Sequence, residues 1–392
     1  MSPSAPQAAP FLPPPAVPQP LPALTGIVVH WRDETRLAEL IAAWPHDDQR
    51  FELVVVDNSA SATTAYLPSQ PAAIEPPADR PSQPPRPPEP PAAAPAGSPA
   101  DAPAPAAPAP IHRLRPARNL GFAGGVNAGV AAGRAPLLLL LNPDALPEPG
   151  ALAQLLAGFA AHPEAAGLAP RLAGADGEPQ FAWQLRRLPS AWGCLRQTLP
   201  WPFAGAAGAT GGLAAEPPPG TPVEQPAAAA LALRRDALLA AGGFDERFHP
   251  AWFEDVDLAH RLRQTGARLL YWPAARFRHA LGSSVPRLGY GRFLWIYHRG
   301  LERYLAKHHG AAWLPAARAG LIAGLLLRLP LVAVRRPRRA ASRREAAAGL
   351  LVALAGALSG WRLPRAVALD PAGDATGQPP ATTRSRRGRD GS

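Results

Sequence analysis

Three apolar runs, two of which end in an acid or an amide, constrain the fold of this chain most strongly. They are GIVVHW (26–31), FELVVVDN (51–58) and PLLLLLNPD (136–144). An amphipathic pattern (33–44) and a glycine-rich helical pattern (119–133) lie between them, the second after a short strand pattern, IHRLR. Continuous apolar strands that alternate with helices are typical of a mostly parallel sheet covered on both faces. The sequence therefore predicts the α/β class, with helices flanking such a sheet.

Proline limits how much of the chain can join this domain. Of the 392 residues 53 are proline, and many of them lie in 1–24 and 63–110. These segments have no apolar period and cannot bury enough surface to offset the entropy of the chain. We predict disordered segments at 1–24 and 366–392, a domain over 25–310 with a disordered proline-rich insert at 63–110, and a C-terminal helical region over 311–365.

The net charge of +11 raises the possibility of a nucleic-acid partner. Much of the excess, however, lies after residue 330, in RRPRRAASRRE and RSRRGR, and no basic stripe with interleaved aromatics crosses the folded part. We therefore expect no nucleic acid, and an anionic membrane surface is the better candidate. A single cysteine and an N-terminus without an apolar signal region lead us to expect a cytoplasmic protein.

Polar side chains follow two of the predicted strands directly. Asp57 and Asn58 follow one strand, and Asn142 and Asp144 follow another. Ligands of parallel sheets bind beyond the carboxyl ends of the strands. Asp and Asn are also good turn residues, so either pair alone fits a simple turn. Two acids at two strand ends favour a shared ligand site.

A third cluster lies in GGFDERFHPAWFEDVDLAHRLRQTG (242–266). Glu254, Asp255 and Asp257 open a predicted helix, where the helix dipole favours acids, and Asp257 can pair with Arg261 one turn later. Neither effect accounts for the aromatic residues just before them. An apolar wall beside a carboxylate raises its pKa, which suits a general base.

Five stretches together resemble the inverting glycosyltransferases of family 2, and in particular their rhamnosyltransferase-like branch. They are VVVDNSA, NLGFAGGVNAGVAAG, LLLLNPDALPEPGAL, AAALALRRDALLAAGGFDERFHPAWFEDVDLAHRLRQTG and WPAARFRHALGSS. They follow the family's order over most of residues 26–310. The resemblance implies the GT-A fold, a Rossmann-like arrangement of sheet and helices.

The resemblance also implies roles for individual residues. Asp255 matches the catalytic base. Asp144 matches the acid that holds a divalent metal, Mg²⁺ or Mn²⁺, on the diphosphate of the donor, and His279 matches a histidine that joins this metal site. The residues expected to bind substrate are Asp57, Asn58, Ser59, Asn119, Gly121, Gly124, Gly125, Asn127, Asn142, Trp252 and Glu254.

Several residues differ from the family pattern or are not assigned to the site. Asn142 replaces the first acid of the usual metal-binding motif, which leaves one neutral ligand. His30 ends the first strand where relatives carry a different turn, and we interpret it as a buried, hydrogen-bonded histidine. We expect His308 and His309 to be ordinary surface residues.

The expected activity is transfer of a sugar, with rhamnose from dTDP-rhamnose favoured, from a nucleotide-diphosphate donor. The expected acceptor is a glycan or a lipid-linked sugar in cell-envelope polysaccharide biosynthesis. The alternative is a non-catalytic GT-A-like scaffold or sugar-binding protein. A dinucleotide-dependent oxidoreductase would need G-x-G-x-x-G after the first strand, where HWRDET stands instead. A P-loop kinase would need G-K-[ST], which the chain lacks.

The apolar segments at 311–334 and 346–360 raise a separate question. Arg318 and Arg328 interrupt the first, whereas a membrane-spanning helix needs about 20 apolar residues. Both segments fit interfacial helices at the inner face of the cell membrane, with flanking arginines near anionic headgroups. The alternative is a helical hairpin packed on the catalytic domain.

Overall fold

The computed structural model describes residues 21–59, 110–199, 212–280, 288–337 and 339–362. The predictions of disorder at 1–24, 63–110 and 366–392 fall almost entirely outside these ranges and stay predictions.

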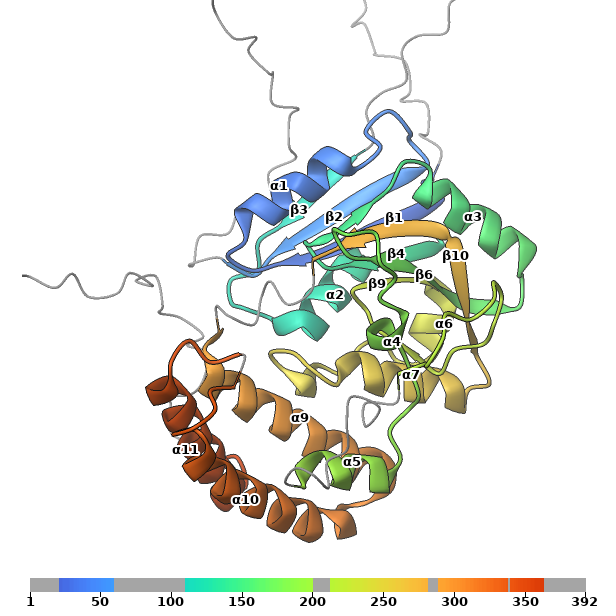
Figure 1. Ribbon diagram of the computed structural model, residues 1–392. Helices are drawn as coiled ribbons and strands as arrows, with labels where there is room; N and C mark the ends of the chain where they lie inside the picture. The colour runs from blue at the N-terminus through green and yellow to red at the C-terminus, as the bar shows by residue number, and fades with distance from the viewer. Residues whose placement is uncertain (1–20, 60–109, 200–211, 281–287, 338, 363–392) are drawn as a thin grey trace, which may run out of the picture.

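One eight-stranded sheet forms the centre of the molecule (Figure 1), in the order β3-β2-β1-β4-β9-β6-β10-β5. Its strands are β1 (Leu24–His30), β2 (Phe51–Asp57), β3 (Ile111–Leu114), β4 (Leu137–Leu141), β5 (Ala145–Pro147), β6 (Ala165–Ala173), β9 (Ala230–Arg234) and β10 (Arg268–His279). β1 to β4 run parallel, as do β6 and β10, while β9 and β5 run antiparallel to their neighbours. The predicted α/β class with a mostly parallel sheet is confirmed.

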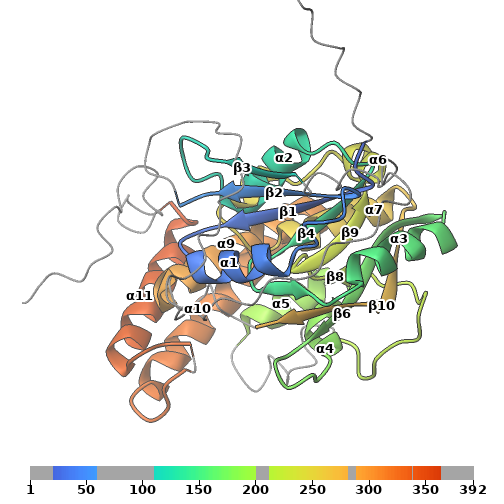
Figure 2. The same cartoon turned by 90° about the horizontal axis from the view of Figure 1, so that it is seen from above.

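Helices cover both faces of the sheet. α1 (Glu34–Ala43) and α3 (Ala151–Ala161) bury Leu40, Leu155 and Phe159 on one face. The other face carries α2 (Gly121–Ala132), α6 (Arg235–Ala240) and α7 (Glu254–Gln264). Figure 2 shows these two groups on opposite sides of the strands. The strands are apolar throughout because both of their faces are buried.

Short elements connect these layers. They are α4 (Phe181–Gln184), α5 (Ala191–Thr198), the 3-10 turns η2 (Glu246–Phe248) and η3 (Ala311–Trp313), and a two-stranded sheet of β7 (Leu185–Arg186) and β8 (Gln225–Pro226). α4 follows β6 closely and lies near the end of β10, which places it beside the carboxyl ends of the strands.

The C-terminal helices pack together and on the rest of the chain. α9 (Tyr290–His309), α10 (Leu314–Leu331) and α11 (Arg343–Ser359) share an apolar core, and α10 also contacts α5. These contacts are of the kind that the alternative, a helical hairpin packed on the catalytic domain, describes. Among the described residues, the helix Ala311–Leu331 is long and apolar enough to cross a membrane by length and composition, and 22% of its apolar window is buried.

Candidate active site

Asp57 ends β2 and is held as an anion. His30 at the end of β1 contacts it at 3.2 Å through Nδ1, and the Ser59 amide donates to it at 2.9 Å. The hydrogen bond from His30 is the main cause that lowers the pKa of Asp57 to about 2, and burial opposes it. The Asp33 amide donates to Nε2 of His30 at 2.9 Å, so both ring nitrogens are engaged. The interpretation of His30 as a buried, hydrogen-bonded histidine is confirmed.

Asn58 holds the turn that leads into α2. Its amide nitrogen donates to the Gly121 carbonyl at 2.9 Å, and its oxygen accepts from the Leu120 amide at 3.2 Å. Asn119 closes the same turn, because its side-chain oxygen accepts from the Gly121 amide at 2.8 Å. The hydrogen bonds of these side chains stabilise the turn. The sequence predicted a substrate contact for them and did not reveal this structural role.

The glycines of α2 allow close packing on the protein itself. Gly121 has a φ of +70°, and a Cβ there would lie 2.7 Å from the Pro250 carbonyl oxygen. A Cβ at Gly125 would lie 2.8 Å from Val29 on β1, and one at Gly124 would lie 3.0 Å from Leu120. Glycine at these positions is therefore required by packing, whether or not a ligand also approaches.

Asn127 joins α2 to the segment before α7. Its side-chain oxygen accepts from the Phe244 amide at 2.9 Å, and its nitrogen donates to the Phe244 carbonyl at 2.9 Å and to Glu246 at 3.0 Å. Asn142 ends β4, where its backbone nitrogen donates to Ala229 of the neighbouring chain segment at 2.8 Å. Its backbone oxygen closes the turn that carries Asp144.

Asp144 and His279 come together although they are far apart in the sequence. β5 pairs with β10 so that Ala145 lies opposite His279, which brings the preceding Asp144 beside the ring. Nε2 of His279 lies 3.6 Å from Oδ1 of Asp144, and both side chains are buried. Burial lowers the pKa of His279, and the charge of Asp144 opposes that shift. The Nε2 edge of the imidazole therefore faces the Asp144 side chain.

This pair fits a divalent cation. Nε2 of His279 is buried without a hydrogen-bond partner among the described residues. Imidazole nitrogen and carboxylate oxygen are both common metal ligands. No group of three or more His, Cys, Asp or Glu side chains with metal-binding geometry occurs in the described part of the chain. The protein would thus supply two ligands, and phosphate oxygens and water would supply the others.

A hollow of about 420 Å³ adjoins His279. It is lined by Gly174, Ala175, Asp176, Glu178, Pro179, Gln180, His279 and Ala280. Gln180 and Trp183, which contact His279 from this side, belong to no motif that the sequence analysis used. Only the fold brings the turn after β6 to the end of β10.

Asp255 stands at the start of α7 within a set of hydrogen-bond donors. Its Oδ2 accepts from Nε2 of Gln225 at 3.3 Å and from the Ala228 amide at 3.4 Å. Arg186 lies 3.7 Å from the same oxygen, and 17% of the Asp255 side chain remains exposed. This carboxylate is oriented by β7, β8 and the chain before β9, and it keeps some access to a ligand.

The raised pKa that the sequence predicted in this cluster is found at Glu254. Burial raises the pKa of Glu254 well above its usual value, and the neighbouring charge of Asp255 adds to the shift. Oε2 of Glu254 is buried and has no hydrogen-bond partner among the described residues. The helix register places the side chain of Glu254 toward the protein interior and the side chain of Asp255 toward β8.

The aromatic residues before α7 pack against α9. The Trp252 ring meets Phe293 edge-on at 5.1 Å, and Phe253 meets Tyr297 at 5.2 Å. Both residues have positive φ angles, +70° and +73°, which turn the chain sharply into α7. Trp252 and Phe253 therefore mainly connect the start of α7 with α9.

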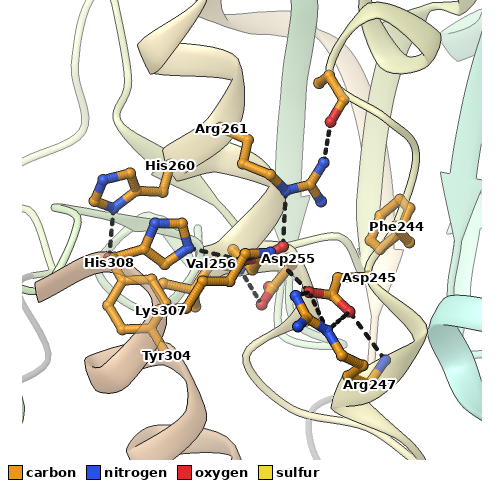
Figure 3. Close-up of polar contacts among 12 residues, drawn as sticks. Phe244, Asp245, Arg247, Asp255, Val256, His260, Arg261, Tyr304, Lys307 and His308 are labelled. Atoms are coloured by element: carbon orange, nitrogen blue, oxygen red, sulfur yellow. Dashed lines mark hydrogen bonds and ion pairs between the residues drawn. The ribbon is translucent and has the colours of Figure 1, made fainter. Parts of the chain in front are cut away.

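Asp257 anchors α7 to α9, and its partners Arg261, Lys307 and His308 are labelled in Figure 3. The predicted pair with Arg261 is present at 2.9 Å, and Lys307 and His308 approach the other oxygen at 2.6 and 2.7 Å. The prediction that His308 lies at the surface is wrong: its side chain is 4% exposed and its ring stacks on His260 at 4.0 Å. His309 contacts the Pro189 carbonyl at 2.9 Å. Only the packing of α9 on α7 creates these contacts.

Sequence comparison identifies the family. Residues 97–215 match the family described as Glycosyl transferase family 2. An N-acetylglucosaminyl-diphospho-decaprenol L-rhamnosyltransferase of Mycobacterium tuberculosis, found in strains CDC 1551 and H37Rv, is 36% identical over 112 residues. The chain contains a region similar to glycosyltransferase family 2. The resemblance seen in the motifs is thereby confirmed at the level of the family. The aligned region covers 28% of this chain and only 36% of the mycobacterial relative.

Solved structures similar to this chain are more distant. The mannosyltransferase PcManGT from Pyrobaculum calidifontis, in complex with GDP-Man and Mn²⁺, is 16% identical, with 87% of this chain and 88% of that chain covered and a TM-score of 0.44. TarS 1–349 of S. aureus is 12% identical, with 86% and 91% covered and a TM-score of 0.39.

Proposed function

We propose that this chain is an inverting glycosyltransferase that uses a nucleotide-diphosphate sugar. The observation that carries the proposal is the buried Asp144–His279 pair, which fits a divalent cation at the carboxyl end of the sheet. Asp57 at the end of β2 offers an ionised carboxylate to the nucleotide, and Asp255 offers a second carboxylate at the start of α7.

The chemistry follows from these groups. Mg²⁺ or Mn²⁺, when bound, would offset the negative charge that develops on the diphosphate as it leaves. Asp144 and His279 would hold that ion. Asp255 would accept the proton of the acceptor hydroxyl while the hydroxyl oxygen bonds to the anomeric carbon and the bond to the diphosphate breaks. One such displacement inverts the configuration at that carbon.

We propose dTDP-rhamnose as the donor and a lipid-linked or glycan acceptor in cell-envelope polysaccharide assembly. The mycobacterial relative is named as an L-rhamnosyltransferase that acts on a diphospho-decaprenol-linked N-acetylglucosamine, which supports both choices. The hollow beside His279, lined by Asp176 and Glu178 among others, offers oxygen acceptors for sugar hydroxyls.

We also propose that the protein works in the cytoplasm at the inner face of the cell membrane. Large apolar side chains remain exposed on the C-terminal helices, namely Leu326, Leu327, Leu331, Val334, Leu351 and Leu358. Exposed arginines at 335, 343 and 344 lie in the connection from α10 to α11 and at the start of α11. Exposed apolar groups beside arginines suit an anionic lipid surface, which is also where a lipid-linked acceptor resides.

The direct test is a donor screen on the purified full chain. dTDP-rhamnose, UDP-sugars and GDP-mannose would each be incubated with a lipid diphosphate-linked N-acetylglucosamine, with Mn²⁺, with Mg²⁺ and with EDTA. We expect release of dTDP and a glycosylated lipid in the presence of metal. Binding of a sugar nucleotide without transfer or hydrolysis under any condition would favour the alternative, a non-catalytic sugar-binding protein.

A further inference from the structure

His279 is held from two directions by residues of the turn after β6. Nε2 of Gln180 donates to the His279 carbonyl at 2.9 Å, and Oε1 of the same amide lies 2.9 Å from Nδ1 of His279. The Trp183 ring stacks on the imidazole at 5.1 Å with 28° between the planes. One short segment therefore constrains the backbone of His279, one edge of its ring and one face of its ring.

The directions of these hydrogen bonds define the tautomer of His279. A carbonyl oxygen can only accept, so the Gln180 group that faces the His279 carbonyl must be the NH₂ group. The other end of the amide, Oε1, can only accept as well, so Nδ1 of His279 must carry the proton. A neutral ring then has its lone pair at Nε2. That nitrogen is the buried atom 3.6 Å from Oδ1 of Asp144.

We infer that Gln180 is a positioning residue: it locks His279 in the Nδ1–H tautomer and so directs the Nε2 lone pair at the space beside Asp144 where a divalent cation would bind. The inference rests on the metal site of the proposed function. Partners of this kind commonly orient metal-binding histidines.

The backbone supports the position of Gln180 independently of His279. The Gln180 amide nitrogen donates to the Leu172 carbonyl of β6 at 2.8 Å, and Gln180 precedes the helical turn α4. β6 and β10 are neighbouring parallel strands, with Leu172 opposite Phe277. The side chain of Gln180 therefore reaches His279 from a backbone position that is hydrogen-bonded to the adjacent strand β6.

The experiment uses the full chain labelled with ¹⁵N-histidine. Long-range ¹H–¹⁵N spectra distinguish a protonated ring nitrogen from one with a free lone pair, and His279→Ala identifies the signals of His279. We expect Nδ1 protonated and Nε2 unprotonated in the unsubstituted protein without metal. A signal from the Nε2–H tautomer in this sample would overturn the inference without any variant.

Three variants complete the test, with Mn²⁺ alone as the probe and free Mn²⁺ measured by electron paramagnetic resonance. Gln180→Leu removes both hydrogen bonds and should mix the tautomers and weaken Mn²⁺ binding about tenfold or more. Gln180→Glu keeps the acceptor for Nδ1–H, so it should keep the tautomer and lose less affinity than Gln180→Leu. Gln154→Leu makes the same change at an exposed position of α3 and should alter neither signal.

The outcomes separate this inference from the proposed function. If Asp144→Ala abolishes Mn²⁺ binding while Gln180→Leu changes neither the His279 spectrum nor the affinity, the role of Gln180 is wrong and the metal site stands. If Asp144→Ala leaves Mn²⁺ affinity unchanged, the metal site itself is wrong, and Gln180 has no metal ligand to direct.

Discussion

Two neighbouring acids, Glu254 and Asp255, have opposite surroundings although they share the first turn of α7. Glu254 points into the protein, where burial raises its pKa well above the usual value. Asp255 accepts hydrogen bonds from Gln225 and the Ala228 amide and faces Arg186. A base must be able to reach a substrate, and the Asp255 side chain, which is 17% exposed, meets this requirement better than the buried Glu254.

The first prediction concerns Asp255. Asp255→Asn keeps the shape of the side chain but removes its ability to take a proton, so transfer should fall on the order of 100-fold or more. Donor affinity, measured separately by calorimetry, should stay close to that of the unsubstituted chain. Asp236→Asn, at an exposed acid of α6, is the matched control. Turnover within a few-fold of normal in Asp255→Asn would remove this residue from the role of base.

The second prediction concerns Glu254 and the pH dependence of stability. Because the folded pKa of Glu254 lies above its unfolded value, its ionisation opposes folding. Its stabilising contribution is complete below about pH 4.5, the usual value, and is lost as the pH rises through the folded pKa. Glu254→Gln cannot ionise, so its free energy of unfolding relative to the unsubstituted chain should increase as the pH rises from about 4.5 to the folded pKa of Glu254.

Urea unfolding of both proteins at pH 5 and pH 8 measures this difference. Glu39→Gln, at an exposed site on α1, provides the control and should show no such trend. A difference between the Glu254→Gln variant and the unsubstituted chain that is the same at both pH values would contradict the buried position of Glu254.

At the scale of the elements, the contact between α7 and α9 positions the proposed base. Asp257 is buried and pairs with Arg261 of its own helix and with Lys307 and His308 of α9. These pairs lower the pKa of Asp257 against the effect of burial. This buried carboxylate and its partners therefore add to the aromatic contacts that attach the start of α7 to α9.

The third prediction follows from this attachment. Asp257→Ala leaves cationic groups without their buried partner, so the free energy of unfolding should fall by roughly 3–5 kcal/mol. Glu39→Ala, which breaks the exposed pair with Arg36 on α1, should cost about 0–1 kcal/mol. Chemical denaturation of the two variants makes the comparison. Equal losses in both would mean that the buried pairs contribute no more than a surface pair.

At the scale of the whole molecule, the C-terminal helices have an inner face and an outer face. Inward residues such as Leu321, Leu325 and Leu350 pack against α9, so removing residues 312–392 would expose its apolar side. Point substitutions on the outer face separate membrane binding from folding more cleanly than truncation. Leu326, Leu327 and Leu331 are 50%, 56% and 59% exposed.

The fourth prediction uses these leucines. Changing Leu326, Leu327 and Leu331 together to Asn should reduce co-sedimentation with vesicles that contain anionic lipid and leave the melting temperature nearly unchanged. Leu239→Asn on α6, where the leucine is 57% exposed, controls for the loss of an exposed apolar side chain elsewhere. Binding of the unsubstituted chain should weaken with added salt, because arginines act through screened charge. Undiminished pelleting of the triple variant would locate the membrane contact elsewhere, if there is one.

The fifth prediction concerns the proline-rich insert, most of which lies outside the described residues. β2 and β3 pair in parallel, with Leu53 opposite Ile111, so the connection must return along the length of the strands. Replacing residues 63–109 with a Gly/Ser linker of about 12 residues should therefore preserve transfer to a soluble acceptor analogue. A three-residue linker should disrupt folding. Loss of activity with the longer linker, in a variant that melts normally, would give the insert a role in the reaction.

Local sequence patterns were sufficient to predict much of the framework. The apolar runs at 26–31 and 51–58 correspond closely to β1 and β2, and the acids after them stand at the strand ends as expected. The helix start at Glu254 was also predictable. These features depend on neighbours within a few residues, where the spacing of apolar side chains reports the local geometry directly.

Local sequence patterns could not predict the contacts between distant segments. The antiparallel insertion of β9 between β4 and β6, and the approach of His279 to Asp144, depend on strand pairing across long stretches of chain. Gln180 and His308 occur in no recognisable motif, yet one contacts the proposed metal ligand and the other the buried Asp257. Whether a side chain becomes a ligand, a support or a surface group depends on which distant segment packs against it, because burial and hydrogen-bond partners arise only once the chain has folded.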